Sequence, residues 1–259
     1  MPRIKLIVEY DGTNYVGWQI QQNGASVQGR LQRALAELLG EPIEVQAAGR
    51  TDSGVHALGQ VACFDTARRL PLKAYWMGLN GILPEDISIV RAEEVSADFD
   101  PRRWSQGKRY RYLISNRRCR SPLRRLTHWE IFQPLDVPAM VAAGKALVGR
   151  HDFSAFRASD CQAAHAMREV RVLEVAGQAG DQVVLMVEGT AFLKHMVRNF
   201  AGTLVEVGRG RRPVEWVKAT LEGRDRTQAG PTAPPQGLTL VEVFYAAGPP
   251  AERADSEDQ

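Results

Sequence analysis

The chain has 259 residues, enough for one large domain or two smaller ones and for a core that needs no disulfide or metal staple. Hydrophobic residues make up 44% and charged residues 24%, which is ordinary for a soluble globular protein, and no apolar run approaches the roughly 18 residues of a membrane span. The three cysteines are widely separated, so neither a disulfide framework nor a cysteine zinc site is expected. The cysteines are expected to be free thiols, which favours a cytoplasmic protein.

The net charge of +3 is unevenly distributed along the chain. Ten basic residues and no acidic residue lie between Arg102 and Arg125, so this block carries +10, which leaves −7 for the rest of the total of +3. Four aromatic residues lie in or beside the block: Trp104, Tyr110, Tyr112 and Trp129. Cations attract phosphates and aromatic rings stack on unpaired bases, so this combination favours a nucleic-acid partner over the alternative of a solvated basic face.

In the first part of the chain, hydrophobic periodicity predicts strands alternating with helices. A strand is expected at 4–10 and a helix at 27–39, with Ser26 as N-cap and Gly40 as stop signal. Further elements are strands at 43–47, 60–66 and 87–95, and a helix at 72–83. The turn-prone stretch 98–101 follows, and it predicts an N-terminal domain over 1–100.

A similar set of elements follows over 101–246, the expected C-terminal domain. Strands are predicted at 110–115, 170–175, 183–188 and 238–244, and helices at 137–148 with Asp136 as cap, 192–207 and 213–221. Because many strands are close enough in sequence to form hairpins, the fold class is predicted as α+β, each half a mainly antiparallel sheet with helices on one face. Residues 247–259, rich in Pro, Ala and acidic residues, are expected to form a disordered tail.

The segment 47–57, between two predicted strands, has a composition that a purely structural connection does not require. It holds two glycines, several small polar residues, Arg50, Asp52 and His56. A mobile hairpin loop with a turn at Asp52 is one interpretation. The other is a catalytic loop, because an Asp carboxylate held on a short connection and kept ionised by a nearby cation can act as a covalent nucleophile.

Three blocks of the sequence together resemble a known family. They are GRTDSGVHA at 49–57, GKRYRY at 107–112 and HMVRN at 195–199. In this order they resemble the signature blocks of the TruA-type tRNA pseudouridine synthases, with support from shorter stretches at 9–12, 18–19, 152–156 and 237–240. The resemblance extends from about residue 3 to 246.

This resemblance implies an enzyme that isomerises uridine to pseudouridine at positions 38, 39 and 40 in the anticodon stem-loop of tRNA. It also implies two pseudo-symmetric halves with the active-site cleft between them, and a homodimer as the assembly. The reaction needs no redox change, so no cofactor and no metal are expected, which agrees with a sequence lacking a P-loop and a dinucleotide fingerprint. The partners are tRNA and a second copy of the chain, with no membrane.

The resemblance also assigns roles to individual residues. Asp52 is the nucleophile, attacking either C6 of the base or C1′ of the ribose, and Arg198 pairs with its carboxylate and lowers its pKa. Tyr110 stacks on the target base or assists proton transfer, and Tyr112 is expected in the core. The target base must be flipped out of the stem, and Arg50 is the candidate to enter the vacated space.

Further residues are expected to contact the RNA. His56 hydrogen-bonds either RNA or the protein backbone. Contacts to phosphates are expected from four arginines of the basic block: Arg102, Arg103, Arg109 and Arg111.

Two other classes of function remain open. A non-catalytic tRNA-binding or RNA-chaperone protein would need the basic block but would have no use for Asp52. A glycosidase or nucleotide hydrolase would normally need two cooperating carboxylates, and only Asp52 lies in a loop of this character.

Overall fold

The computed structural model describes residues 1–246, and the expected acidic tail at 247–259 lies outside the described residues. The described chain divides into two compact units. Of the described residues, the first holds Met1–Gln106 together with 239–246, and the second holds Gly107–Leu238. The division therefore lies six residues after the predicted boundary at residue 100, and the final strand, predicted in the C-terminal half, belongs with the first unit.

The sheet of the first unit has the strand order β4-β1-β3-β10, with the short β2 beside β3. β1 is antiparallel to both neighbours, with Ile4 opposite Phe64 of β3 and Glu94 of β4, whereas β10 is parallel to β3. The strands are β1 (Arg3–Tyr10), β2 (Gln46–Ala47), β3 (His56–Asp65), β4 (Ile87–Val95) and β10 (Leu238–Tyr245). Because β10 pairs with β3, the chain returns to its first sheet at the end.

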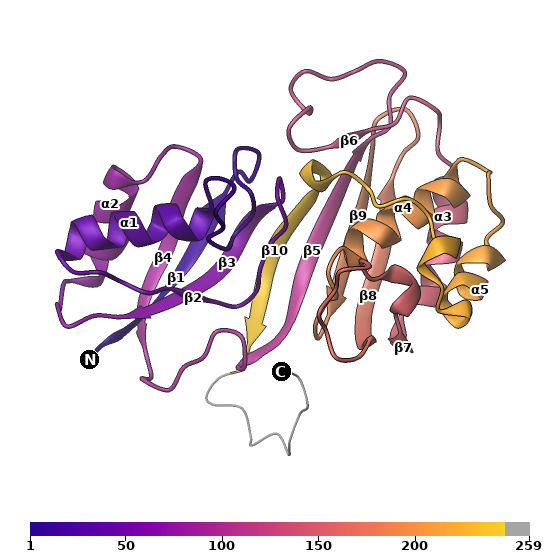
Figure 1. Ribbon diagram of the computed structural model, residues 1–259. Helices are drawn as coiled ribbons and strands as arrows, with labels where there is room; N and C mark the ends of the chain where they lie inside the picture. Colours follow the sequence, from indigo (N-terminus) through magenta and orange to yellow (C-terminus); the bar gives the residue numbers. More distant parts are fainter. Residues whose placement is uncertain (247–259) are drawn as a thin grey trace. The chain divides into compact units, whose positions relative to one another are not determined.

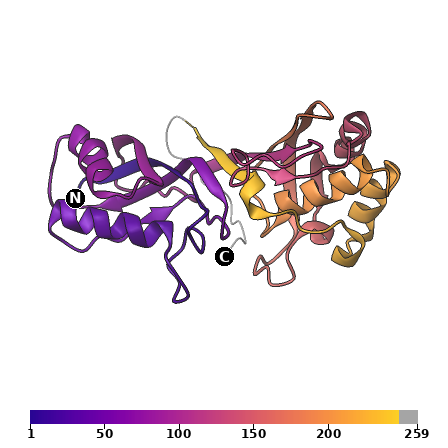
Figure 2. The same cartoon turned by 90° about the horizontal axis from the view of Figure 1, so that it is seen from above.

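Two helices, α1 (Val27–Leu39) and α2 (Leu72–Ile82), pack on one face of this sheet (Figures 1 and 2). α1 begins and ends as predicted, because the Ser26 side chain accepts a hydrogen bond from the Gly29 amide and Gly40 adopts a left-handed conformation with φ 73°. Its buried stripe includes Val27, Leu31 and Leu35. Helix caps and apolar spacing are local signals, so this element is recovered from sequence to the residue.

The sheet of the second unit has the strand order β5-β9-β8-β7, with the short β6 beside β5. All pairs are antiparallel except β5 with β6. The strands are β5 (Ser105–Ser115), β6 (Trp129–Glu130), β7 (Gly149–Asp152), β8 (Met167–Gly177) and β9 (Gln182–Gly189). The α+β prediction of mainly antiparallel sheets with helices is confirmed in both units.

Three helices, α3 (Val137–Gly144), α4 (Met196–Gly208) and α5 (Glu215–Gly223), belong to the second unit (Figure 1). α3 is capped by Asp136 as predicted and contacts β8 and α4. Short 3-10 turns lie at Lys145–Leu147, Ser154–Phe156, Arg226–Gln228 and Pro235–Gly237. α4 begins four residues later than predicted, because His195 adopts a left-handed conformation with φ 64° and the helix starts after it.

Candidate active site

Asp52 lies in the connection between β2 and β3, residues 48–55, which we call the Asp52 loop. Backbone hydrogen bonds hold the chain on both sides of this residue. The Trp18 amide donates to the Thr51 carbonyl at 3.1 Å, and the Val55 amide donates to the carbonyl of Asp52 itself at 3.2 Å. Asp52 is half-buried, and Arg50 is exposed. These bonds give the Asp52 carboxyl a defined backbone beneath it, which favours the catalytic interpretation of this loop over a mobile hairpin.

Glycines allow a second segment to press against the Asp52 loop. A Cβ on Gly17, whose φ is +110°, would lie 2.6 Å from the Thr51 carbonyl oxygen, and one on Gly12 would lie 2.0 Å from the carbonyl oxygen of Val55. Carbon and oxygen cannot approach so closely without a shift of the backbone. The segment after β1 therefore supports the loop through contacts that only glycine permits.

Buried hydroxyl and amide groups lie directly under the loop. The Tyr10 and Thr51 hydroxyls are 2.8 Å apart in a buried position, and Gln60 Nε2 donates to the Gly49 carbonyl at 2.9 Å. Tyr10 is 3% exposed, Thr51 7% and Gln60 0%. Burial raises the pKa of Tyr10, so its hydroxyl keeps its proton and remains available for the hydrogen bond with Thr51.

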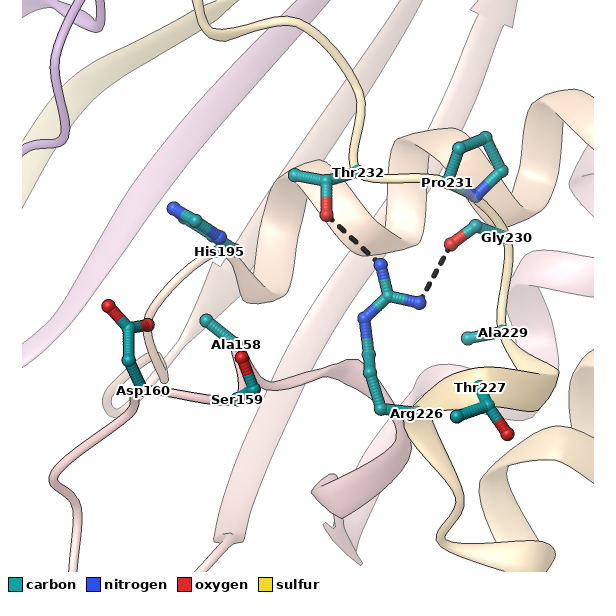
Figure 3. A pocket seen from close by; sticks show the side chains of 10 residues that line it. All are labelled: Ala158, Ser159, Asp160, His195, Arg226, Thr227, Ala229, Gly230, Pro231 and Thr232. Carbon is teal, nitrogen blue, oxygen red and sulfur yellow. Dashed lines mark hydrogen bonds between the residues drawn. The ribbon is translucent and has the colours of Figure 1, made fainter.

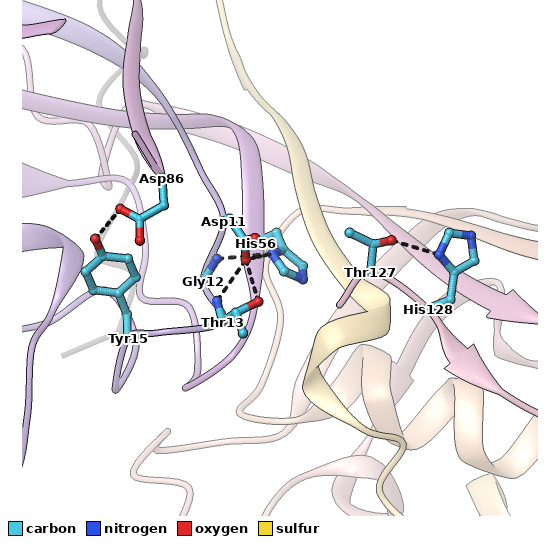
Figure 4. A network of polar contacts seen from close by, with 8 residues as sticks. All are labelled: Asp11, Gly12, Thr13, Tyr15, His56, Asp86, Thr127 and His128. Carbon is cyan, nitrogen blue, oxygen red and sulfur yellow. Dashed lines mark hydrogen bonds and ion pairs between the residues drawn. The ribbon is translucent and has the colours of Figure 1, made fainter. Parts of the chain in front are cut away.

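His56, the first residue of β3, joins the loop to the end of β1 (Figure 4). Its Nδ1 lies 3.1 Å from the Gly12 amide and 3.0 Å from Asp11 Oδ1. One nitrogen cannot accept from Gly12 and donate to Asp11 at the same time, so Nδ1 accepts from Gly12 in the tautomer that leaves it without a proton and donates to Asp11 when it carries one. His56 is 6% exposed, and backbone contact, one of its two predicted roles, is present.

Asp11 has its own anchors. Its Oδ1 accepts from the amide of Thr13 at 2.9 Å and from the Thr13 hydroxyl at 2.5 Å. Burial tends to raise the pKa of Asp11, but the hydrogen bonds from Thr13 and the neighbouring His56 outweigh it and hold the pKa below the usual value. Figure 4 also shows Tyr15, whose hydroxyl donates to Asp86 at 2.5 Å in the same unit.

In the second unit, Tyr110 lies on β5 opposite Val187 of β9. Its ring meets Phe192 edge to face, with centroids 5.1 Å apart and an interplanar angle of 82°. Two residues on, Tyr112 is fully buried and donates its hydroxyl to the Pro234 carbonyl at 2.8 Å. Tyr112 thus lies in the core, where it was expected, whereas Tyr110 is half-buried.

Arg198 lies in the first turn of α4. Its Nε donates to the Ala233 carbonyl at 2.8 Å, and the Ala233 amide donates back to the Arg198 carbonyl at 3.2 Å. This reciprocal pair holds the start of α4 against the segment before β10 and sets the direction of the side chain. The charge of Arg198 also acts on Tyr112, whose pKa is raised by burial and lowered in part by this guanidinium.

Glycines also pack the back of α4 closely. A Cβ on Gly202 would lie 1.7 Å from the Pro231 carbonyl oxygen, and Asn199 Nδ2 donates to the Phe156 carbonyl at 2.7 Å. An adjoining hollow of about 570 Å³ is lined by His195 and Arg226 among others, and Figure 3 shows these side chains. The Arg226 guanidinium donates to Gly230, Thr232 and Asn199 at 2.9 to 3.1 Å, so this arginine is used for structure.

Known proteins resemble the chain over nearly its whole length. The family model described as tRNA pseudouridine synthase matches residues 6–102 and 143–246. A curated tRNA pseudouridine synthase A from Myxococcus xanthus is 67% identical over 97% of this chain and 95% of the relative. One from Geotalea uraniireducens is 51% identical over 95% of this chain and 100% of the relative. The chain belongs to the tRNA pseudouridine synthase family.

A solved Cbf5-Nop10-Gar1 complex also matches, with a TM-score of 0.36 and 12% identity over 78% of this chain and 54% of that one. The chain thus spans about half the length of that protein. The two sequence relatives, of which this synthase chain covers 95% and 100%, show the family.

Within the synthase chain, the predicted site residues fall into two groups. Arg50, Asp52 and His56 share one loop and strand end of the first unit. In the second unit, β5 carries Arg109, Tyr110 and Arg111, and α4 carries Arg198. Arg109 Nε lies 2.5 Å from Glu188 Oε1, and the remaining two, Arg102 and Arg103, are exposed in the turn before β5.

Sequence reasoning missed the buried support of Asp52. Tyr10 counts simply as an apolar position in the alternation of β1, and Gln60 as a residue within a strand. The one local signal is that a polar Gln occupies an otherwise apolar stretch of β3. A polar side chain that is fully buried needs a partner, which identifies it as a candidate loop support.

Within residues 1–246, no cluster of three or more His, Cys, Asp or Glu side chains is arranged to hold a metal ion. None of the helices described here has the length and apolar character needed to cross a membrane.

Proposed function

We propose that this protein isomerises uridine to pseudouridine at positions 38, 39 and 40 of the tRNA anticodon stem-loop, with Asp52 as nucleophile. The family membership supports the reaction and the substrate class. The observation that carries the residue assignment is the buried support of the loop: Tyr10 bonds the Thr51 hydroxyl and Gln60 bonds the Gly49 carbonyl, so the segment that leads into the half-buried Asp52 is held from below. A binding protein without chemistry would have no need of such a fixed carboxylate.

The reaction conserves every atom of the nucleotide. The Asp52 carboxylate attacks C6 of the base or C1′ of the ribose, the bond from N1 to C1′ breaks, and the base turns before C5 bonds to C1′. The proton from C5 leaves to solvent, N1 gains a proton, and the carboxylate is released unchanged. Both routes end in the same bonds, so loss of the C5 hydrogen reports the isomerisation whichever atom is attacked first.

The other expected residues complete the proposal. Arg198 is the cation proposed to pair with the Asp52 carboxylate; a pair 4 Å apart at an effective dielectric near 20 has a Coulomb attraction of roughly 4 kcal/mol, partly offset by desolvation. Tyr110 stacks on the flipped base, and Arg50 occupies the space it leaves. Phosphate contacts are proposed for four arginines: Arg102, Arg103, Arg109 and Arg111. The domain organisation proposed is that of two halves that each supply part of the site.

The decisive experiment uses unmodified tRNA whose uridines carry tritium at C5. The wild-type protein is expected to release tritium, and Asp52→Ala is expected to lose activity by at least about a thousandfold because no nucleophile remains. Glu44→Ala, which removes an exposed carboxylate from the segment before β2, should keep wild-type activity. Full activity in Asp52→Ala would refute the assigned nucleophile, and release of free uracil by the wild type would indicate a hydrolase.

We also propose a homodimer acting in the cytoplasm on tRNA. Sedimentation equilibrium at micromolar concentration tests the assembly directly, since a dimer has twice the 28.7 kDa mass of the chain. A mass that stays at one chain across the concentration range would contradict it.

A further inference from the structure

The basic block of the sequence is divided by the structure into two kinds of cation. On β5, Arg109 is paired with Glu188 and, like Arg111, is half-buried. Beyond the end of β5 lies a loop, residues 116–128, which we call the arm. It holds five arginines and no acidic residue. Figure 1 shows the arm as the long loop that extends past the sheet between β5 and β6.

The base of the arm is firmly bound to the second unit. Asn116 is 1% exposed, and its Nδ2 donates to the carbonyls of Ile131 and Gln133 at 2.9 and 2.7 Å, while its Oδ1 accepts from the Leu135 amide at 3.1 Å. Part-way along the arm, the Ser121 amide donates to a carboxylate oxygen of Glu130 at 2.6 Å. These bonds fix where the chain leaves and rejoins the sheet.

The five arginines of the arm differ in whether their side chains have a partner. Arg124 pairs with Asp181 at 3.0 Å, and Arg125 donates to the Pro122 carbonyl at 2.7 Å within the arm's own turn. The side chains of Arg117, Arg118 and Arg120 contact no hydrogen-bond or ion-pair partner within residues 1–246. Three adjacent unneutralised cations repel one another, so an anionic ligand that places phosphates beside them gains from all three.

The tip of the arm carries an exposed leucine, Leu123, which is 95% exposed. A second copy of the chain and an RNA are two possible occupants of such a surface. The charge favours RNA, because two identical arms would bring like charges together, whereas a polyphosphate neutralises them. RNA also tolerates an apolar side chain, which can lie against an unpaired base or a ribose.

We propose that the arm is a tRNA-binding element. It binds phosphates of the substrate that do not belong to the nucleotide being isomerised. This inference rests on the proposed function and adds to it the residues that capture the substrate. The arm binds by charge: Arg117, Arg118 and Arg120 contact phosphates, and none of them contacts the reacting atoms.

The test measures binding of unmodified tRNA between about 50 and about 200 mM salt, where each phosphate contact contributes roughly 0.7 to 0.9 to the slope of log affinity against log salt. The variant replaces Arg117, Arg118 and Arg120 with Gln. Its slope should fall by about 2 to 3, with affinity at low salt reduced at least tenfold and the tritium-release rate at saturating tRNA unchanged. The same three positions changed to Lys should restore most of the slope.

The matched control removes the same number of charges elsewhere, with Gln at three exposed cations of the described chain: Arg69, Lys73 and Lys145. Its slope should stay within about 1 of the wild type. A wild-type slope in the arm variant overturns the proposal, as does a change of oligomeric state in Leu123→Ala, because the arm would then be a contact between copies. If the wild type binds tRNA but releases no tritium, the proposed function is wrong. The slopes of log affinity against log salt then still test whether the arm binds tRNA.

Discussion

The Asp52 loop and the arm are both polar connections that leave a strand, yet the protein supports them in opposite ways. The Asp52 loop is bound from below by the buried side chains of Tyr10 and Gln60 and from the side by glycine contacts. The arm is bound at its base by Asn116 and Glu130, while three of its five arginines contact no partner within residues 1–246. The Asp52 loop is therefore held in place along its length, whereas the arm is held only where it leaves and rejoins the sheet.

The difference follows from what each task requires. A nucleophile must be held within a fraction of an ångström of its target, since a small misplacement can cost a factor of about 100 in rate. Phosphate capture depends on charge that acts over the Debye length of about 8 to 10 Å, so small displacements of an arginine matter little. We therefore expect substitutions beneath Asp52 to lower the rate and substitutions on the arm to weaken binding.

The largest effect is expected from Gly17→Ala. The new Cβ would lie 2.6 Å from the Thr51 carbonyl oxygen, at a φ of +110° that L-residues rarely adopt. Overpacking and backbone strain together should lower the free energy of unfolding by at least about 3 kcal/mol. Because the displaced atoms adjoin Asp52, tritium release should also fall by at least about 100-fold in the fraction that remains folded.

Gly180→Ala is the matched control for Gly17→Ala. Gly180 also has a positive φ, +96°, but none of the described atoms lies within 4 Å of where the new methyl group would stand, so only backbone strain of about 1 kcal/mol is expected, with normal activity. Denaturant titration and the tritium assay on both variants separate the two contributions. Equal losses in the two variants would show that close approach of Gly17 does not support the loop.

A smaller effect with a clearer signature is expected from Tyr10→Phe. This change leaves the buried Thr51 hydroxyl without its partner, which should cost roughly 1 to 3 kcal/mol in the free energy of unfolding. It should also lower kcat about tenfold while leaving KM for tRNA within about twofold, because the loop shifts but the binding surface does not.

Tyr75→Phe provides the comparison. Tyr75 is a tyrosine of the same unit with 1% exposure, and its hydroxyl donates to the Arg68 carbonyl at 3.0 Å, away from the Asp52 loop. It should lose a similar amount of stability and keep kcat. If Tyr75→Phe lowers kcat as much as Tyr10→Phe, the loss reflects general destabilisation, and the positioning role of Tyr10 is wrong.

The fold was predictable from sequence where its signals are local. Helix α1 is recovered with both ends because Ser26 and Gly40 are themselves the caps. Strand β3 begins at His56, four residues before the predicted start, because its first residues pair with Tyr10 of β1 and with Thr239 and Leu240 of β10. Those partners are distant in the sequence, so periodicity in a short window does not contain them.

The candidate site shows the same limit. Arg50, Asp52 and His56 stand together in one short segment, which composition singles out and to which the family resemblance assigns roles. The supports of Asp52 come from three separate segments, and their contribution depends on burial that only the fold creates. The apolar stripe predicted for α4 included Phe192, which instead lies before the helix and contacts Tyr110, because the left-handed His195 separates it from the helix.

The smallest effect concerns pH and the base of the arm. Burial lowers the pKa of His128, and the nearby charges of Arg124 and Arg111 lower it further, although the Gln182 side chain acts to raise it. Because the folded pKa lies below the usual 6.5, the unfolded chain takes up the proton first as pH falls. His128 therefore contributes stability above 6.5 that is progressively lost as pH falls from there through the folded pKa.

His128→Gln removes this titration, so the difference in free energy of unfolding between wild type and variant should shrink as pH falls from about 7.5 to about 5. Urea unfolding across that range measures it, with His165→Gln, an exposed histidine of the same unit, as the control for losing an imidazole. A pH-independent difference would mean that protonation of His128 does not contribute to the pH dependence of stability. Since the arm acts through charge rather than exact position, this loss of stability should leave the salt dependence of tRNA binding unchanged wherever the protein stays folded.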